Sequence, residues 1–299
     1  MAELYPGREI RAVCFGFPKR DGDLAAGNAY LAQACAMDCA EGRPRRFYPL
    51  RLFDPNETDR AAVRRELENG GFWGVKPYPA YAAGSDPEDV EIRDMLPDWI
   101  LEIVQDLGRI VMLHLPRRGR LADPVNRRQL AEICRDFPRA RIVLAHAGRA
   151  YFLRAIVGHL EPLCRFDNLW FDLAMLNHWE VLEHLFAHAR QDRVLYATDT
   201  PIALAPGKSV EINDQYTYVT PVPWELSICD SQGRIRFASF AYEELRAIKR
   251  AVWRLGLGAD FVEDLMWRNG TRLLESPPRA ARTPRNSARG AKDGRNGQN

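Results

Sequence analysis

Two short apolar runs, residues 110–113 and 142–145, are each followed by a histidine, His114 and His146, with Pro or Gly two residues later. A continuous run of Val, Ile and Leu bounded by turn residues is typical of a strand in a parallel sheet that is covered on both faces. Such sheets bind their ligands at the carboxyl ends of the strands. Both histidines are therefore predicted to lie on the ligand-binding side of one sheet.

A third apolar run, residues 193–198, is followed by Asp199 and then by Thr200 and Pro201. A carboxylate at the end of an apolar strand needs a partner, because burying it unpaired is costly. Two imidazoles and a carboxylate at three strand ends can together hold a divalent metal ion or transfer protons.

Strands and helices alternate along most of the chain in units of about 30 residues, as in βαβ units. The predicted strands cover residues 9–18, 46–53, 72–78, 109–115, 141–147, 168–176 and 193–198. Arg109, Arg141 and Arg193 lie at their amino ends, whereas His, Lys and Asp lie at their carboxyl ends. This polarity fits a (β/α)8 TIM barrel, whose chemistry is confined to one face. A closed barrel needs eight strands, and seven are found.

A long insertion, about residues 202–240, follows the last predicted strand. Its second half contains two β-like runs around residues 230–233, which predict a hairpin. We expect the insertion to cover the functional face as a lid. The barrel domain is assigned to residues 1–275, and residues 276–299 are rich in Pro, Arg, Gly and Asn and are expected to form a disordered tail.

Charge and cysteine content exclude several classes of protein. The formal net charge of +2 combines a tail with six basic residues and one acidic residue, a net +5, with a body that carries −3. The body therefore does not resemble a nucleic-acid surface. Six cysteines without a CxxC pair indicate a reducing, cytoplasmic setting. No apolar run is long enough to span a membrane.

The segments that end the predicted strands resemble the amidohydrolase superfamily, and most closely its amidohydrolase-related branch of metal-dependent hydrolases and decarboxylases. The matching pieces are GFWGVKPYP, VMLHLP, LAHAGR, LWFDLAML, YATDTP and DLMWRNGTRLL, in the order of the family. The resemblance covers roughly residues 9–274, far more than a lone motif. It implies a TIM barrel of amidohydrolase type with a metal-dependent active site.

The resemblance assigns roles to individual residues. His114 matches the family's metal ligand after its fifth strand, and His146 matches a residue that is either a second ligand or a catalytic hydrogen-bonding group. Asp199 matches the aspartate that contacts the metal and takes a proton from the attacking water. Lys76 lies at the end of the family's fourth strand, where a lysine can bind an anionic group. Arg149 could grip a substrate carboxylate, although a salt bridge at the rim is equally compatible with its position.

One departure from the family affects the metal. The family begins with a strand carrying His-x-His, whereas this chain has no histidine before His114. The first predicted strand therefore corresponds to the family's second strand. Catalytic zinc usually takes three protein ligands. We therefore expect a divalent metal, zinc or else manganese, to be weakly bound to this chain or absent from it.

Three functions remain open at this point. The first is hydrolysis of a small amide, ester or lactone, in which Asp199 is the general base for a metal-activated water and His146 stabilises the oxyanion. The second is non-oxidative decarboxylation of an aromatic or enoic acid. The third is a truncated, inactive barrel with exposed sheet edges. The expected partners are a small substrate, possibly a carboxylate, and possibly a second copy of the chain. His184 and His188 are interpreted as a solvated helix face, Asn177 as a helix cap, and Asp172 receives no role.

Overall fold

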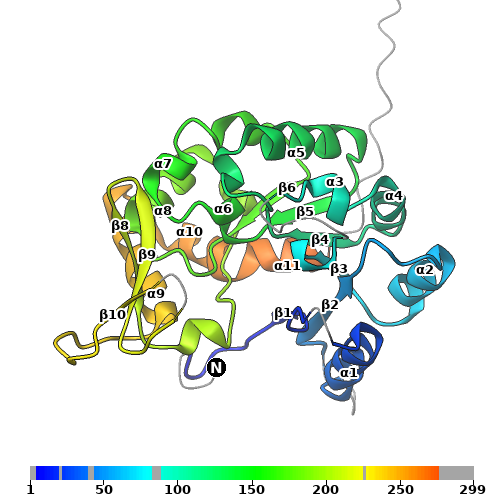
Figure 1. The fold of residues 1–299 in the computed structure, drawn as a ribbon, viewed down its shortest axis with the longest axis horizontal. Coiled ribbons are helices and arrows are strands. Elements are labelled where there is room, and N and C mark those ends of the chain that lie inside the picture. The colour runs from blue at the N-terminus through cyan, green and yellow to red at the C-terminus, as the bar shows by residue number, and fades with distance from the viewer. Residues whose placement is uncertain (1–4, 20–21, 40–43, 83–88, 225–226, 276–299) are drawn as a thin grey trace, which may run out of the picture.

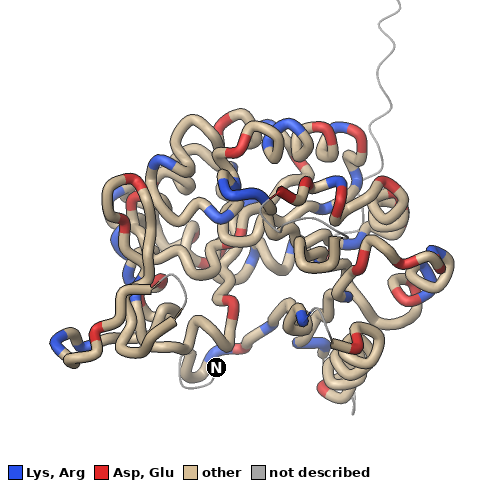
Figure 2. Tube along the Cα trace, in the orientation of Figure 1, with Lys and Arg blue, Asp and Glu red and all other residues tan. Residues whose placement is uncertain are grey.

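The computed structural model describes residues 5–19, 22–39, 44–82, 89–224 and 227–275 (Figure 1). The predicted tail, residues 276–299, lies outside them. Among the described residues, no helix is both long enough and apolar enough to cross a bilayer. Basic and acidic residues are interspersed along the helices at the periphery of the molecule (Figure 2).

Seven parallel strands form one sheet in chain order, which confirms the predicted number, direction and order of the strands. They are β1 (Ala12–Cys14), β2 (Phe47–Phe53), β3 (Gly74–Pro77), β4 (Ile110–Leu113), β5 (Arg141–Leu144), β6 (Leu169–Asp172) and β7 (Val194–Leu195). The sheet curls into a half barrel. Within the described part of the chain, β1 and β7 are its two edges, so the half barrel is open. Each strand is shorter than predicted, most of all β1, β6 and β7.

Helices connect the strands and cover the outer face of the sheet (Figure 1). They are α1 (Leu24–Met37), α2 (Arg60–Asn69), α3 (Ile92–Met95), α4 (Asp98–Leu107), α5 (Pro124–Asp136), α7 (Leu153–Ile156), α8 (Trp179–His188), α9 (Phe240–Arg254), α10 (Ala259–Glu263) and α11 (Asn269–Glu275). Gly108 ends α4 with φ 58°, the left-handed conformation that glycine adopts without a Cβ clash. The helix predicted over residues 151–160 is wrong beyond Ile156, because Val157 is extended and Gly158 has φ 75°.

Apolar side chains fill both faces of the sheet. The outer face carries the main core, to which Val75, Val111 and Phe171 contribute. A smaller inner cluster comprises Leu50, Ile110, Val143, Trp170, Leu195 and Leu273. Gly74 permits close strand packing, since a Cβ there would lie 1.9 Å from the Ile110 carbonyl oxygen.

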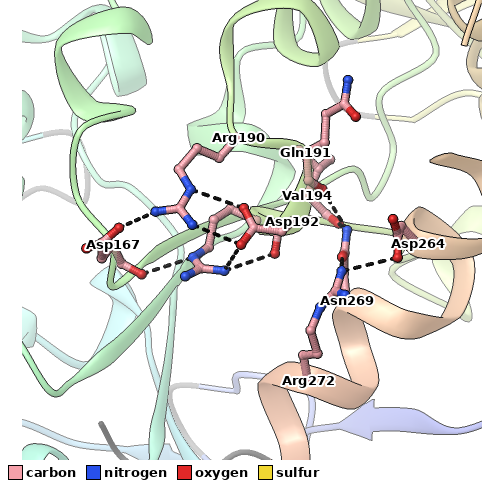
Figure 3. A network of polar contacts seen from close by, with 9 residues as sticks. Asp167, Arg190, Gln191, Asp192, Val194, Asp264, Asn269 and Arg272 are labelled. Atoms are coloured by element: carbon pink, nitrogen blue, oxygen red, sulfur yellow. Dashed lines mark hydrogen bonds and ion pairs between the residues drawn. The ribbon is translucent and has the colours of Figure 1, made fainter. Parts of the chain in front are cut away.

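The amino ends of the strands are closed by arginines and by α11. Arg109 Nε donates to the Leu67 carbonyl oxygen at 3.0 Å, and the Arg141 guanidinium donates to the Leu273 carbonyl oxygen. Figure 3 shows the network at β7, where the Asn269 amide donates at 2.7 Å to the carbonyl oxygens of Gln191 and Val194. These contacts saturate backbone acceptors, so the positively charged amino ends have a structural role.

The insertion forms a second sheet of three strands, β8 (Lys208–Ile212), β9 (Gln215–Thr220) and β10 (Ser227–Cys229). It lies on the opposite side of the molecule from α1 and α2 (Figure 1). The hairpin joins β8 and β9 through Asn213 and Asp214, both of which have positive φ. The hairpin predicted around residues 230–233 is therefore wrong, because β10 pairs parallel to β9 and no described strand follows it.

Candidate active site

His146 occupies the turn that follows β5. Its backbone has φ 55°, and the N–H donates to Asp172 Oδ1 at 2.8 Å. Ring atom Nδ1 lies 2.8 Å from the carbonyl oxygen of Ala174. A carbonyl oxygen only accepts, so Nδ1 carries the proton and a neutral His146 offers the lone pair of Nε2.

Asp172 ends β6 and is 3% exposed. Its Oδ1 accepts the N–H of His146 and, at 3.1 Å, that of Ala174. Burial raises the pKa of Asp172, while the imidazole and N–H of His146 act in the opposite direction. This carboxyl group fixes the end of β5 against the end of β6. The sequence assigned it no role.

His114 follows β4, and its ring is perpendicular to that of His146 at 5.5 Å between centroids. Its Nδ1 is buried without a hydrogen-bond partner among the described residues. Burial lowers the pKa of His114 well below its ordinary value, and Arg149 and His146 lower it further. The ring is therefore neutral, with a shielded nitrogen that is available to a ligand.

Lys76 and Asp199 lie at the ends of β3 and β7, and their charges interact. Lys76 is 2% exposed, and its Nζ lies 5.0 Å from the ring centroid of Tyr78. Burial lowers the pKa of Lys76 to about 8, although the negative charges of Asp172 and Asp199 oppose this shift. Asp199 is half-buried and has φ 60°. Asp199, which follows the end of β7 by four residues, is thus near enough to Lys76 to influence its pKa.

Two arginines border this group, each with a buried Nε that lacks a described partner. Arg149 ends α6 (His146–Arg149), and its Nη1 donates to the Leu115 carbonyl oxygen at 3.0 Å. The Arg120 guanidinium lies 4.7 Å from the ring centroid of Tyr216. No described carboxylate forms an ion pair with either arginine, so the salt bridge considered for Arg149 is not found. Burial and the neighbouring Arg120 lower the pKa of Arg149.

Glu244 on α9 is a buried acid that sequence reasoning missed. It is 0% exposed, its Oε2 accepts the Met175 N–H at 2.9 Å, and its Oε1 has no described partner. Burial raises the pKa of Glu244 well above its ordinary value, and the charges of Asp172 and Asp199 raise it further. The FAYEEL segment contains two adjacent glutamates, and the sequence does not show which of them is buried. Glu243 forms ion pairs with Lys208 and Arg246, whereas Glu244 does not.

The insertion packs on the loops that follow β5 and β6. The ring of Tyr216 contacts that of Tyr151 at 4.7 Å, and Tyr151 in turn lies 5.7 Å from His146. Asn177 is not the helix cap that was predicted. It is buried, and its Oδ1 accepts the Ser209 N–H at 3.0 Å while its amide donates to the Phe240 carbonyl oxygen.

A hollow of about 500 Å³ lies beside α2, α3 and α4. It is lined by Arg60, Arg93, Pro97, Asp98, Trp99 and Glu102. None of these residues belongs to the group around His146, whose own side chain is 7% exposed. Lys76 and His146 are therefore almost inaccessible, whereas His114 and Asp199 are half-buried.

The family model described as Amidohydrolase matches residues 3–275. The chain therefore belongs to the amidohydrolase family, and the expected resemblance is confirmed. A search of the curated proteins finds no match. The fold is shared with several solved structures at low sequence identity.

Three of these structures illustrate the range of proteins that share this fold. An amidohydrolase from Burkholderia multivorans with bound HEPES is 16% identical, with a TM-score of 0.54 over 89% of this chain and 84% of that one. A 5-carboxyvanillate decarboxylase from Novosphingobium aromaticivorans, complexed with manganese and a nitrobenzoic acid, is 14% identical, with a TM-score of 0.53 over 89% and 76%. A probable 2-pyrone-4,6-dicarboxylic acid hydrolase from Acinetobacter baumannii with citric acid is 13% identical, with a TM-score of 0.52 over 88% and 83%.

Proposed function

We propose that the chain is a metal-dependent hydrolase of a small amide, ester or lactone that carries a carboxylate. The observation that carries this proposal is the pair of perpendicular rings of His114 and His146, 5.5 Å apart at neighbouring strand ends. The buried Nδ1 of His114 has no described partner. A metal ion satisfies such a nitrogen.

His114, His146 and Asp199 are the residues that would hold a divalent ion. Two imidazoles and a carboxylate suit zinc and also accept manganese, which one related structure contains. When bound, the ion supplies Lewis acidity, which lowers the pKa of water and polarises a carbonyl group. Of the two roles predicted for His146, its tautomer favours the ligand, because Nε2 presents a lone pair.

The side chains supply the remaining chemistry. The half-buried carboxylate of Asp199 accepts the proton of the attacking water. Lys76 lies within the electrostatic influence of Asp199, and its ammonium group stabilises negative charge that develops on the substrate. Asp172 holds the turn that presents His146.

Arg149 and Arg120 provide the anchor for a substrate carboxylate. Both guanidinium groups lack an acidic partner among the described residues, and each has a buried, unpaired Nε. A buried guanidinium group without an acidic partner is costly, and a substrate carboxylate that pairs with it would offset this cost. Two of the related structures hold carboxylic acids, a nitrobenzoic acid and citric acid.

The insertion, about residues 202–240, is proposed to be a lid over this site. Tyr216 packs on Tyr151, and Glu211 Oε2 lies 3.2 Å from His178 Nε2 and accepts the Leu153 N–H at 3.0 Å. Because Lys76 and His146 are almost inaccessible, a substrate reaches them when these contacts open.

A hydrolase assay tests the proposal. The full chain, supplied with zinc or manganese, is offered small lactones, esters and amides with and without a carboxylate. We expect metal-dependent turnover that Asp199→Asn abolishes while the circular dichroism spectrum is unchanged. Full activity of Asp199→Asn would overturn the assigned role.

Decarboxylation of an aromatic acid is the second candidate. The rings of Tyr78 and Tyr151 lie 5.8 and 5.7 Å from those of His114 and His146, respectively, and such surroundings suit an aromatic substrate. Release of carbon dioxide from a panel of hydroxybenzoic acids, without hydrolysis of any ester or lactone, would favour this reaction. A protein that catalyses neither hydrolysis nor decarboxylation and binds no metal would instead be an inactive barrel.

A further inference from the structure

A second group of metal-ligating side chains lies outside the strand-end site, between α8 and the 3-10 turn η4 (Glu161–Leu163). It consists of Glu161, His184 and His188, whose potential ligand atoms all lie within 4.8 Å of one another. The two imidazoles, one helical turn apart on α8, stack at 4.1 Å between centroids. Glu161 Oε1 lies 3.0 Å from His184 Nε2.

Hydrogen bonds prepare these groups to bind a cation. His188 Nδ1 lies 2.8 Å from the His184 carbonyl oxygen, which places the proton on Nδ1 and leaves the lone pair of Nε2 free. This arrangement is the one that metal-binding histidines use to fix their tautomer. Glu161 Oε1 also accepts the Gly158 N–H at 3.3 Å, which orients the carboxylate.

The charge state of the group agrees with this geometry. Partial burial alone would raise the pKa of Glu161, but backbone N–H groups and both histidines lower it overall, so the side chain is an anion. Partial burial and His188 lower the pKa of His184, which keeps that ring neutral. The group therefore presents one carboxylate and the neutral imidazole of His184 beside the ring of His188.

We propose that Glu161, His184 and His188 form a structural site for zinc or a similar transition metal, separate from the active site. Histidines at i and i+4 present their nitrogens on one face of a helix, and two nitrogens with one oxygen suit zinc. The anchoring is rigid, because Leu163 and Leu185 beside the ligands are buried. The site would tie η4 to α8 and so stabilise the outer wall.

Zinc titration of the full-length chain tests this proposal, with cobalt absorption as a spectroscopic readout. The background variant His114→Ala weakens the active-site metal, so the remaining binding reports the new site. We expect one zinc equivalent in this background, and at least ~10-fold weaker binding when His188→Ala is added. Zinc should raise the melting temperature of the His114→Ala protein and should not raise that of the protein that carries both His114→Ala and His188→Ala. Unchanged zinc affinity on adding His188→Ala would overturn the proposal.

Two further variants keep the test decisive. Glu161→Gln retains an oxygen for the Gly158 N–H but loses the charge, so it should also weaken binding. His159→Gln removes a nearby histidine that is outside the group and should leave the affinity unchanged. If His114→Ala does not fold, His188→Ala alone should lower the zinc stoichiometry by one. Equal effects of His159→Gln and His188→Ala would show that no defined site exists.

Discussion

The backbone N–H of His146 donates a 2.8 Å hydrogen bond to Oδ1 of Asp172, which joins the turn after β5 to the last residue of β6. The same oxygen accepts the N–H of Ala174, whose carbonyl oxygen in turn fixes the His146 ring. One buried carboxyl group thus sets both the backbone and the side chain of a candidate metal ligand. Outer groups of this kind orient metal ligands and determine their affinity.

Asp172→Ala should destabilise the fold, because it leaves two buried N–H groups without an acceptor. Each such group costs about 1–3 kcal/mol, so the free energy of unfolding should fall by about 2–6 kcal/mol. Asp172→Asn keeps the accepting oxygen and should cost much less. Urea unfolding monitored by fluorescence measures both, and equal losses would contradict this account.

Lys76→Met should stabilise the protein near neutral pH. The folded-state pKa of about 8 lies below the ordinary 10.5, so the unfolded chain binds more protons between these values. The contribution of Lys76 to the free energy of unfolding of the wild type therefore rises between pH 8 and pH 10.5. It is lost as the pH falls through 8. The advantage of Lys76→Met should be largest below pH 8, roughly 3 kcal/mol, and should vanish near pH 10.5. A constant difference in unfolding free energy across pH 7–10 would refute it.

Glu244→Gln should reveal a pH dependence of opposite sign. The folded pKa is raised above 4.5, so the favourable contribution of Glu244 is present at low pH and declines as the pH rises toward the folded value. Wild-type stability relative to Glu244→Gln should therefore fall by up to about 1.4 kcal/mol per pH unit above pH 4.5. Urea unfolding of both proteins at pH 5, 6, 7 and 8 measures this. A wild-type stability that rises with pH relative to Glu244→Gln would be inconsistent with a buried neutral acid.

Arg149→Gln should raise KM for a substrate with a carboxylate and leave KM for its neutral amide analogue almost unchanged. Loss of a charge-assisted hydrogen bond of about 1.5–3 kcal/mol corresponds to roughly 10- to 100-fold in affinity. Arg117→Gln is the matched control, since Arg117 already pairs with Asp123 at 3.0 Å. Steady-state kinetics on both substrates decides, and equal changes for the two substrates would exclude a carboxylate anchor.

The order of the strands was predictable because the central strands β4, β5 and β6 are largely buried and read as short apolar runs. The positions of His114, His146 and Asp199 followed from the same runs, since the polar residue after a buried strand lies at the sheet's carboxyl edge. Asp172 was harder to assign, because its partners are backbone N–H groups that have no sequence signature.

Other features depend on tertiary contacts that local patterns do not carry. The sequence predicts a hairpin at residues 230–233, whereas the structure forms it at Asn213 and Asp214, two residue types that tolerate the positive φ that both adopt here. The stacked pair His184 and His188 was interpreted as solvated, because only the fold brings Glu161 beside it. Glu244 reaches the site only because α9 packs against the loop after β6.

The inner cluster of the curled sheet is completed by Leu273 of α11, which is made after every strand of the sheet. Until α11 is synthesised, the amino ends of the strands are therefore exposed to solvent. Chains that stop short of Asn269 lack both this apolar side chain and the amide that saturates Gln191 and Val194. We therefore expect truncation before Asn269 to lower the yield of folded protein, because the amino ends of the strands lose their cover.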